Sequence, residues 1–444
     1  MEATGGQKNC IDLADKLLYI QRSFCRAELI ENWEKKLVNK AWIDARHPMC
    51  NKKLWGLTLL ERNIRELAEL GIQQFVILTN GQTDPQAHYS QGLPPALSVV
   101  YEAAGLQSAL SSLQKTLQEE ASPMVAIEGN ALNDKRVLAQ LLACDTSCTV
   151  RSPNGVNAAC AAVLRSQQAA NLSGDSLTGF LKNTGNDPAF AALDLSEFDT
   201  YVKSLRRNIL PFLLLIEEPA HLQEADRYLR QTVHKGTNDF VASYIHPPLE
   251  FAITRLVSGT SITPNQITLA GIVISAITVY LFATGQLLAG IVLAATKGVL
   301  DGVDGKLARL KLQFSKAGDL LDHISDTVFD ALWYLALGWH FSGGDPASTA
   351  ATFTWILFIS YWVERIVPGV FKKLHGREIY DYAGIDRFMR LIGSRMNNNV
   401  WVMLIGIILG FARETFYLVS LWMFATAAWH TFRLLQITLA NRKI

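Results

Sequence analysis

Residues 300–326 read LDGVDGKLARLKLQFSKAGDLLDHISD and decide the fold of the second half of the chain. The stretch holds two pairs of acids, Asp301 with Asp304 and Asp322 with Asp326, spaced three and four residues apart. Residues at these spacings share one face of a helix, and the short basic loop between the pairs turns the two helices antiparallel. The pairs can then face each other. Two divalent cations, Mg²⁺ or Mn²⁺, would compensate their charge, because such cations prefer oxygen ligands.

These acids stand in a half of the chain that consists of long apolar runs. A helix needs about 20 apolar residues to cross the hydrocarbon core of a membrane. Six runs qualify as candidate spans: 264–284, 287–311, 316–341, 347–370, 391–411 and 415–438. Carboxylates inside such spans are costly, which makes them candidates for function. The sequence therefore predicts an all-α bundle of six transmembrane helices.

Basic residues predict how this bundle is oriented, because cytosolic loops are rich in Lys and Arg. One set of loops carries only Arg413, and the other carries Arg309, Lys311, Lys316, Lys372, Lys373, Arg377, Arg387, Arg390, Arg395, Arg442 and Lys443. The first residues, MEATGGQKNC, lack the apolar core of a signal peptide. We therefore expect an integral membrane protein whose N-terminal domain, acidic site and two termini face the cytosol.

The chain divides into three parts on this basis. Residues 1–205 read as a soluble domain, 206–262 as a linker with a juxtamembrane helix, and 263–444 as the six-span domain. Segment 236–258 is amphipathic and broken by Pro247-Pro248, which favours an interfacial helix along the cytosolic membrane surface. A plain linker is the alternative for this segment.

Small residues and one arginine accompany the acids. Gly305 and Ala308 continue the helix face of Asp301 and Asp304, and Gly318 lies one turn before Asp322, so a ligand could approach the backbone there. Arg309 offers a planar fork suited to phosphate. Together with paired metals, these residues predict a pyrophosphate site. The alternative, that the glycines only allow close helix packing and the acids pair with bases, leaves four carboxylates with too few basic partners.

The stretch resembles the CDP-alcohol phosphotransferase signature D-x2-D-G-x2-A-R-x8-G-x3-D-x3-D, without a gap or substitution. Pro264, Asn265 and Thr268 resemble the P-N-x-x-T segment that opens the first span in this family. The resemblance implies six spans, a homodimer and two metals held by Asp301, Asp304, Asp322 and Asp326. It also implies that the donor nucleotide lies against Pro264, Asn265, Thr268, Gly305, Ala308, Arg309 and Gly318. Asp326 would take the proton of an acceptor hydroxyl that attacks the β-phosphorus, and CMP would leave.

Three arginines are candidates for binding a phosphorylated acceptor, since related enzymes have a basic pocket near this place. They are Arg365, Arg390 and Arg395, in or near the fourth and fifth predicted spans. The alternative is that they are ordinary cytosolic charges in contact with lipid headgroups.

The soluble half predicts a parallel α/β sheet. LTLLERNIRELAEL is an amphipathic helix, and FVILT and MVAIEGN are short apolar strands. The pattern is similar to sugar-phosphate nucleotidyltransferases, which some members of the family carry at the N-terminus. Active relatives have a glycine-rich loop after the first strand and a metal-binding Asp after the second. Here AWIDARHPMCNKK has no glycine and Asn130 takes the place of the Asp, so we predict a non-catalytic domain; Lys52 and Lys53 read as solvated lysines.

The substrates are left open by the sequence. The first expectation is phosphatidyl transfer from CDP-diacylglycerol to a polar alcohol in phospholipid synthesis. The alternatives are a soluble donor such as CDP-inositol with a lipid or polyol-phosphate acceptor, and a bifunctional enzyme that also makes its CDP-alcohol. A cation transporter would not need the glycines and the Ala-Arg pair at these spacings. A net charge of +1 gives no indication of nucleic-acid binding, and the six cysteines read as free thiols.

Overall fold

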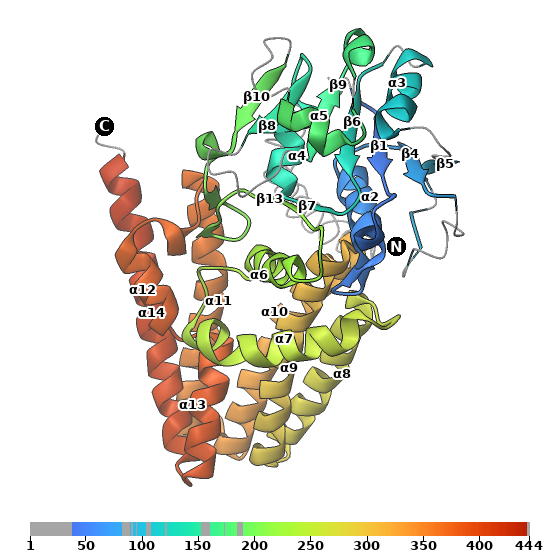
Figure 1. The fold of residues 1–444 in the computed structure, drawn as a ribbon. Helices are drawn as coiled ribbons and strands as arrows, with labels where there is room; N and C mark the ends of the chain where they lie inside the picture. Colours follow the sequence, from blue (N-terminus) through green and yellow to red (C-terminus); the bar gives the residue numbers. More distant parts are fainter. Residues whose placement is uncertain are drawn as a thin grey trace, which may run out of the picture.

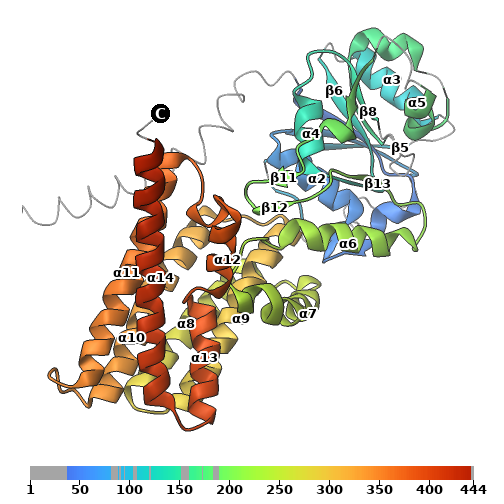
Figure 2. The same ribbon diagram turned by 90° about the vertical axis from the view of Figure 1, so that its left-hand side faces the viewer.

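The computed structural model describes residues 38–81, 89, 92–94, 96–103, 108–119, 122–151, 160–172, 174–183 and 190–441. Over these ranges the chain forms an α/β domain followed by a bundle of long helices (Figure 1), which confirms the predicted division into an α/β and an all-α part. Figure 2 shows the α/β domain beyond one end of the bundle and to one side of it, with α6 along its lower edge.

A seven-stranded sheet forms the centre of the α/β domain, in the order β10-β8-β9-β6-β1-β4-β5. The prediction of a parallel sheet is wrong at β9, which runs antiparallel to both β6 and β8. β9 follows β8 too closely for the helical crossover that parallel neighbours need. The strands are β1 (Lys40–Asp44), β4 (Gln74–Thr79), β5 (Ser98–Ala103), β6 (Met124–Glu128), β8 (Cys148–Arg151), β9 (Ala161–Leu164) and β10 (Ala191–Asp194).

Helices and small ladders surround this sheet. The helices are α2 (Leu59–Glu69), α3 (Ala109–Glu119), α4 (Lys135–Leu142), α5 (Leu177–Asn183) and α6 (His221–Val233), with short 3-10 turns η1 (Pro48–Asn51), η3 (Ser166–Asn171) and η5 (Leu195–Glu197). Three antiparallel ladders pair β2 (Lys53–Leu54) with β3 (Leu57–Thr58), β7 (Ala131–Asn133) with β13 (Leu213–Leu215), and β11 (Tyr201–Val202) with β12 (Arg207–Asn208).

Alternation along the central strand divides the core into two layers. Ala41 and Ile43 of β1 pack into one apolar cluster with α2 and α4, whereas Trp42 points to the opposite face and packs with α3 and α5. Side chains on a strand point alternately to the two faces, so a central strand that is apolar throughout is covered on both. Cys50, Cys144, Cys148 and Cys160 are free thiols; the other two cysteines, Cys10 and Cys25, lie outside the described residues.

Elements beyond residue 205 pack with the α/β domain. β12 pairs with β11, β13 pairs with β7, and α6 shares an apolar cluster with Trp55, Leu59 and Leu132. The boundary at residue 205 stays a prediction, and these contacts favour one after α6. The same domain caps the end of α9, because the Arg62 guanidinium donates to the carbonyl of Leu310 at 2.8 Å.

The bundle has helices at the places where the sequence predicts spans. They are α8 (Pro264–Ala283), α9 (Leu287–Lys311), α10 (Lys316–Ser342), α11 (Thr349–His375), α13 (Met396–Ile408) and α14 (Ala412–Asn441), with a 3-10 turn η7 (Ile379–Asp381) and the short helix α12 (Gly384–Ile392). The predicted fifth span, 391–411, is interrupted at Gly393, and its helix begins only at Met396. Among the described helices, α8 and α11 are long and apolar enough to cross a membrane; the crossing of the others stays a prediction.

Helix α7 (His246–Ser258) lies across the long bundle helices (Figure 1). Pro247 and Pro248 do not break this segment, because they occupy the first turn of α7, where a missing N–H costs no helical hydrogen bond. A π-helical turn, η6 (Val241–Ile245), precedes them and continues into α7. The segment thus contains a helix, as predicted, with the prolines at its start.

Candidate active site

A tight reversal of the chain brings the two acid-bearing helices together. Helix α9 ends at Leu312, which adopts a left-handed conformation with φ 52° and donates its N–H to the carbonyl of Ala308. Helix α10 begins after Ser315, whose hydroxyl accepts from the N–H of Gly318 at 3.1 Å. Since α8 packs against both helices, the acids of α9 and α10 face a common space between them.

Three of the four predicted metal ligands lie together. Carboxylate oxygens of Asp301, Asp322 and Asp326 all lie within 4.8 Å of one another. Asp304 is absent from this cluster, because its carboxylate accepts a hydrogen bond from the Thr268 hydroxyl of α8 at 2.6 Å. The structure therefore brings together three acids for a metal and turns the fourth toward the first helix of the bundle.

Lys297 is a partner of this cluster that the sequence analysis missed. It lies one turn before Asp301 on α9, with its ammonium nitrogen 3.5 Å from the Asp301 carboxylate, and it also forms an ion pair with Asp326. The sequence analysis expected too few basic partners for the acids. The structure shows one such partner, Lys297, for the three clustered carboxylates. The available signal was the i,i+4 spacing to Asp301, which places both side chains on one helix face.

The residues predicted to hold the donor nucleotide are gathered beside the cluster. A Cβ on Gly318 would collide with the Asn265 side chain, and one on Gly305 would lie 3.3 Å from the Arg309 guanidinium. Pro264 opens α8 after Thr263, which caps the helix in a capping box with Gln266. The start of α8, the end of α9 and the start of α10 therefore meet, and Ala308 lies on α9 between Gly305 and Arg309.

A polar cavity lies next to the acids, on the side of α11 and α13. Arg365 and Arg395 both line it, together with Asp330, Tyr334, Tyr361, Glu364, Ser394, Met396 and Met423. Asp330 lies one turn beyond Asp326 on α10, and it pairs with the Arg365 guanidinium at 3.1 Å. Two of the three predicted acceptor residues thus share one cavity, and one of them is already neutralised.

Arg390 lies outside that cavity but beside Arg395. Their guanidinium carbons lie 4.1 Å and 5.8 Å from the centre of the Tyr380 ring, so both arginines stack on one tyrosine. Arg390 is 9% exposed, and its Nε and Nη1 atoms have no hydrogen-bond partner among the described residues. A buried guanidinium without a carboxylate is costly, which keeps Arg390 a candidate for binding an anion.

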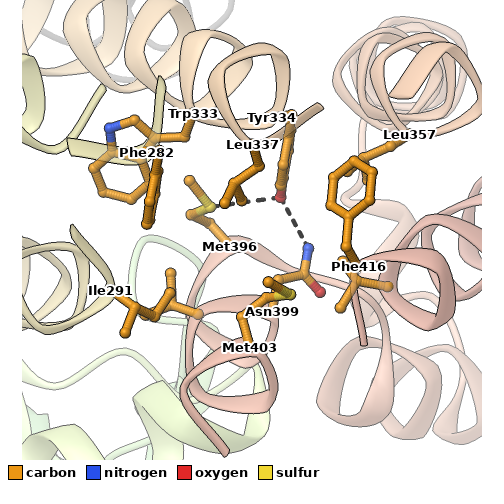
Figure 3. Close-up of a pocket in the computed structure, with 12 residues that line it drawn as sticks. Phe282, Ile291, Trp333, Tyr334, Leu337, Leu357, Met396, Asn399, Met403 and Phe416 are labelled. Atoms are coloured by element: carbon orange, nitrogen blue, oxygen red, sulfur yellow. Dashed lines mark hydrogen bonds between the residues drawn. The ribbon is translucent and has the colours of Figure 1, made fainter. Parts of the chain in front are cut away.

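An apolar cavity adjoins the polar one, since Tyr334 and Met396 line both. Figure 3 shows the residues that line the apolar cavity. Tyr334 separates the two, since its hydroxyl accepts from the Asn399 amide at 2.8 Å and donates to the Met396 sulfur at 3.4 Å. Phe282, Trp333 and Phe416 line the apolar side.

The α/β domain has its own acidic residues at the carboxyl ends of β1 and β6. The sequence analysis took AWID as the start of the loop that follows the first strand. The structure corrects this, because AWID forms β1 itself. Asp44 accepts two hydrogen bonds from the Arg46 guanidinium, at 2.9 and 2.8 Å. Glu128 accepts from the backbone and hydroxyl of Thr178; burial raises its pKa to about 6, and Asp44 adds to this. Asn130 is buried and donates to the carbonyl of Ile216 at 2.9 Å.

Residues 261–432 match the CDP-alcohol phosphatidyltransferase family. These residues therefore form a CDP-alcohol phosphatidyltransferase domain. A bifunctional IPC transferase and DIPP synthase of Aquifex aeolicus is 26% identical over 263 residues, 54% of this chain and 59% of that protein. This alignment is longer than the family domain, so it extends into the residues before it. The archaetidylinositol phosphate synthase of Pyrococcus horikoshii is 41% identical over 97 residues, 21% of this chain and 50% of that protein.

A solved structure of the Mycobacterium tuberculosis phosphatidylinositol phosphate synthase in complex with manganese and citrate is 18% identical, with a TM-score of 0.33. The superposition covers 43% of this chain and 88% of the chain of the mycobacterial synthase. The matched part of this chain spans little more than half the length of the two curated relatives.

Proposed function

We propose that the chain is an integral membrane CDP-alcohol phosphotransferase that transfers a phosphoalcohol group to an acceptor hydroxyl and releases CMP. The observation that carries the proposal is the convergence of Asp301, Asp322 and Asp326 within 4.8 Å inside the family domain. A single ammonium, that of Lys297, contacts this cluster among the described residues, so the three carboxylates retain an excess of negative charge.

The donor set fits a divalent metal, since carboxylate oxygens are the ligands that Mg²⁺ and Mn²⁺ prefer. We propose that Asp301, Asp322 and Asp326 hold two such cations with help from Asp304. Bound there, the cations would supply positive charge to the diphosphate of the donor. Asn265, Thr268 and Arg309, with the small residues around them, would position the cytidine nucleotide.

The proton of the acceptor is assigned to Asp326. The acceptor oxygen forms a bond to the β-phosphorus, the bond from that phosphorus to the CMP oxygen breaks, and the proton passes to the Asp326 carboxylate. Asp326 is suited to this because it is the member of the cluster nearest in the helix to Asp330 and the polar cavity. Lys297 would hold the carboxylate in place between the two sites.

Arg390 and Arg395 would bind the phosphate or another anionic group of the acceptor. Both stack on Tyr380, and the buried guanidinium of Arg390 has two nitrogens without partners in the described part of the chain. Arg365 has a different role in this proposal, since its ion pair with Asp330 and its hydrogen bond to Tyr361 at 3.0 Å already use its donors. It would hold the wall of the cavity rather than the ligand.

The donor in this proposal is a soluble CDP-alcohol such as CDP-inositol, with a lipid or polyol-phosphate acceptor. Four curated relatives are named bifunctional IPC transferase and DIPP synthase, and another is named an archaetidylinositol phosphate synthase. These names favour the soluble donor over phosphatidyl transfer from CDP-diacylglycerol, which was the first expectation from the sequence.

We place the bundle across a membrane, in a homodimer, with the acids at the cytosolic end. Large apolar side chains are exposed on α8, α10, α11, α13 and α14, among them Leu269, Trp339, Trp355, Ile408 and Phe424. A soluble surface rarely carries so many, whereas lipid covers them without cost. In a variant lacking the native cysteines, a single cysteine in place of Lys373 should react with a label from the cytosolic side. Reaction only from outside would overturn this orientation.

The α/β domain is proposed to be non-catalytic. Arg46 folds back on Asp44, and Asn130 serves a backbone carbonyl, so neither is free for a triphosphate or its metal. Arg62 and Arg65 of α2 instead donate to the carbonyls of Leu310 and Lys311. The domain would therefore hold the end of α9, which carries the donor residues.

A donor and acceptor panel tests the transferase proposal. Full-length protein in detergent is incubated with Mn²⁺ or Mg²⁺, CDP-inositol or CDP-diacylglycerol, and lipid or polyol-phosphate acceptors, and CMP is measured. We expect metal-dependent CMP release with CDP-inositol. Release only from CDP-diacylglycerol would return the assignment to phosphatidyl transfer, and no metal-dependent release from any pair would refute the transferase.

A further inference from the structure

One arginine of the α/β domain lies within electrostatic range of the arginine pair on Tyr380. Arg206 is the last residue of the turn that joins β11 to β12, and its φ of 53° lies in the left-handed region. A non-glycine residue pays about 1 kcal/mol or more for that conformation, and such residues gather at functional sites. The Arg206 side chain has no hydrogen bond or ion pair within the described ranges. A contact of this side chain inside the chain therefore does not offset the free energy of the left-handed conformation.

The chain around Arg206 is held against the segment that contains Gly236 and Thr237. The carbonyl of Leu205 accepts from the N–H of Gly236 at 2.7 Å, and the carbonyl of Arg206 accepts from the Thr237 hydroxyl at 3.4 Å. Gly236 permits this approach, since a Cβ there would lie 2.5 Å from the Arg206 carbonyl oxygen. The turn is thereby fixed to the segment that leads into η6.

That segment is in turn bound to the first turn of α13, directly after Arg395. The Asn397 amide donates to Asp239 at 3.3 Å, and the N–H of Val241 donates to the side-chain oxygen of Asn398 at 3.2 Å. Burial lowers the pKa of Arg206; Glu378 and Tyr380 oppose this, and the charge of Arg395 lowers it further. Arg206 is also within electrostatic range of Arg390.

The acids near these three arginines each have a partner, although the second oxygen of Glu364 has none among the described residues. Asp239 accepts from Asn397 and from the N–H of Ala242, Glu364 pairs with His430 at 2.7 Å, and Glu378 pairs with Lys372 at 2.9 Å. Arg206 is thus tethered near Arg390 and Arg395, within the range of their charges, and none of the three guanidinium groups has an ion pair with a carboxylate among the described residues. An anion bound among them would relieve their mutual repulsion and give the buried nitrogens of Arg390 a partner.

We propose that Arg206 completes the anion site of Arg390 and Arg395, so that the α/β domain contributes a binding residue to the transferase site. This rests on the proposed function and makes it more specific: the acceptor carries a phosphate, and that phosphate lies between the two domains. Fusion to the α/β domain then has a direct role in acceptor binding, separate from any nucleotidyl transfer.

Substitution by glycine separates this role from a structural one. Arg206→Gly removes the guanidinium but also relieves the left-handed strain, so the thermal stability of the full chain should be equal or higher. We expect the KM for a polyol-phosphate acceptor to rise about tenfold, with the KM for the CDP-alcohol unchanged, because a charge-assisted hydrogen bond is lost. Arg206→Lys should recover part of the affinity, and Lys182→Ala at the exposed end of α5 should behave as wild type.

Binding of inorganic phosphate to the full chain, measured by calorimetry, gives a readout independent of turnover. It should weaken about fivefold or more in Arg206→Gly and in Arg390→Lys. An acceptor KM and a phosphate affinity equal to wild type in Arg206→Gly would overturn the inference, even if Arg395→Ala weakens both. Loss of CMP release in the wild type with every acceptor would instead overturn the proposed function.

Discussion

Asp301, Asp322 and Asp326 of the bundle contact one ammonium group, whereas Asp44 and Glu128 of the α/β domain each have a partner. The side chains are of the same kind, but the surplus of negative charge is larger in the bundle: three carboxylates contact one ammonium there, whereas Asp44 pairs with Arg46 and Glu128 accepts from Thr178. A carboxylate that is already paired contributes to folding, and a cluster that is not fully paired needs something from outside the chain. The comparison teaches that the number of partners, and not the number of acids, distinguishes a candidate metal site from acids that are already bound within their domain.

The largest effect should come from Asp326→Asn, which keeps size and shape but cannot accept the proton. We expect CMP release at saturating acceptor to fall by about 10² to 10⁴, with donor binding within several-fold of wild type. The measurement pairs CMP release with equilibrium binding of the CDP-alcohol. Asp319→Asn, on the same helix but exposed, is the control and should leave both unchanged. Turnover near the wild-type rate in Asp326→Asn would remove it from proton transfer.

A smaller effect is expected at the basic side of the site. Arg395→Ala should raise the acceptor KM about tenfold or more, since a charge-assisted contact to an anion is lost, and should leave the donor KM unchanged. Initial rates of CMP release at varied acceptor concentrations provide the test. Lys373→Ala, at the exposed end of α11, serves as the control. An equal rise in both constants would show that Arg395 supports the whole site rather than the acceptor.

Substitution of an acid in the α/β domain should leave CMP release nearly unchanged, unlike substitution of Asp326. Asp44→Asn in the full chain should change CMP release less than about twofold, because its carboxylate only pairs with Arg46. The same protein, wild type or variant, should release no pyrophosphate from CTP with any sugar or polyol phosphate. Pyrophosphate release that disappears in Asp44→Asn would make the domain a working nucleotidyltransferase and remove the contrast between the two regions.

The smallest effect concerns Glu128, whose folded pKa of about 6 lies above its ordinary 4.5. A raised pKa means that its contribution to stability is present below pH 4.5 and is lost as pH rises through 6. Glu128→Gln should therefore stabilise the domain at pH 8, by about 2 kcal/mol at most, and lose that advantage near pH 4. Thermal unfolding of both proteins at the two pH values checks this. A destabilised variant at pH 8 would show that the ionised carboxylate is needed.

Spacing predicted which acids and small residues lie together, because i,i+3 and i,i+4 positions fix what shares a helix face. The length of the apolar runs predicted the six long helices. Spacing could not place Asp304 against Thr268 or Lys297 on Asp326, since such pairs depend on rotamers and on how the helices cross. The contact between the buried Arg390 and Tyr380 could not be predicted either, because it depends on the turn at η7, which positions Tyr380.

In the α/β domain, alternation and apolar runs located β4, β6 and α2 but not the direction of β9. Strand direction depends on how the connection before it is routed, and a short apolar run carries no sign of that. The roles of β12, β13 and α6 were missed for a related reason. β13 is a three-residue strand that gains its stability from pairing with β7, a partner far away in the sequence.

Binding of Mn²⁺ to the full chain tests the central comparison most directly. Free Mn²⁺ is followed by electron paramagnetic resonance during titration of the wild type, Asp322→Asn, Asp44→Asn and Glu128→Gln. The account predicts saturable binding in the wild type, weakened on the order of tenfold or more in Asp322→Asn and unchanged in the two variants of the α/β domain. Full retention of Mn²⁺ by Asp322→Asn, with loss in Asp44→Asn or Glu128→Gln, would place the metal in the other half of the molecule and contradict it.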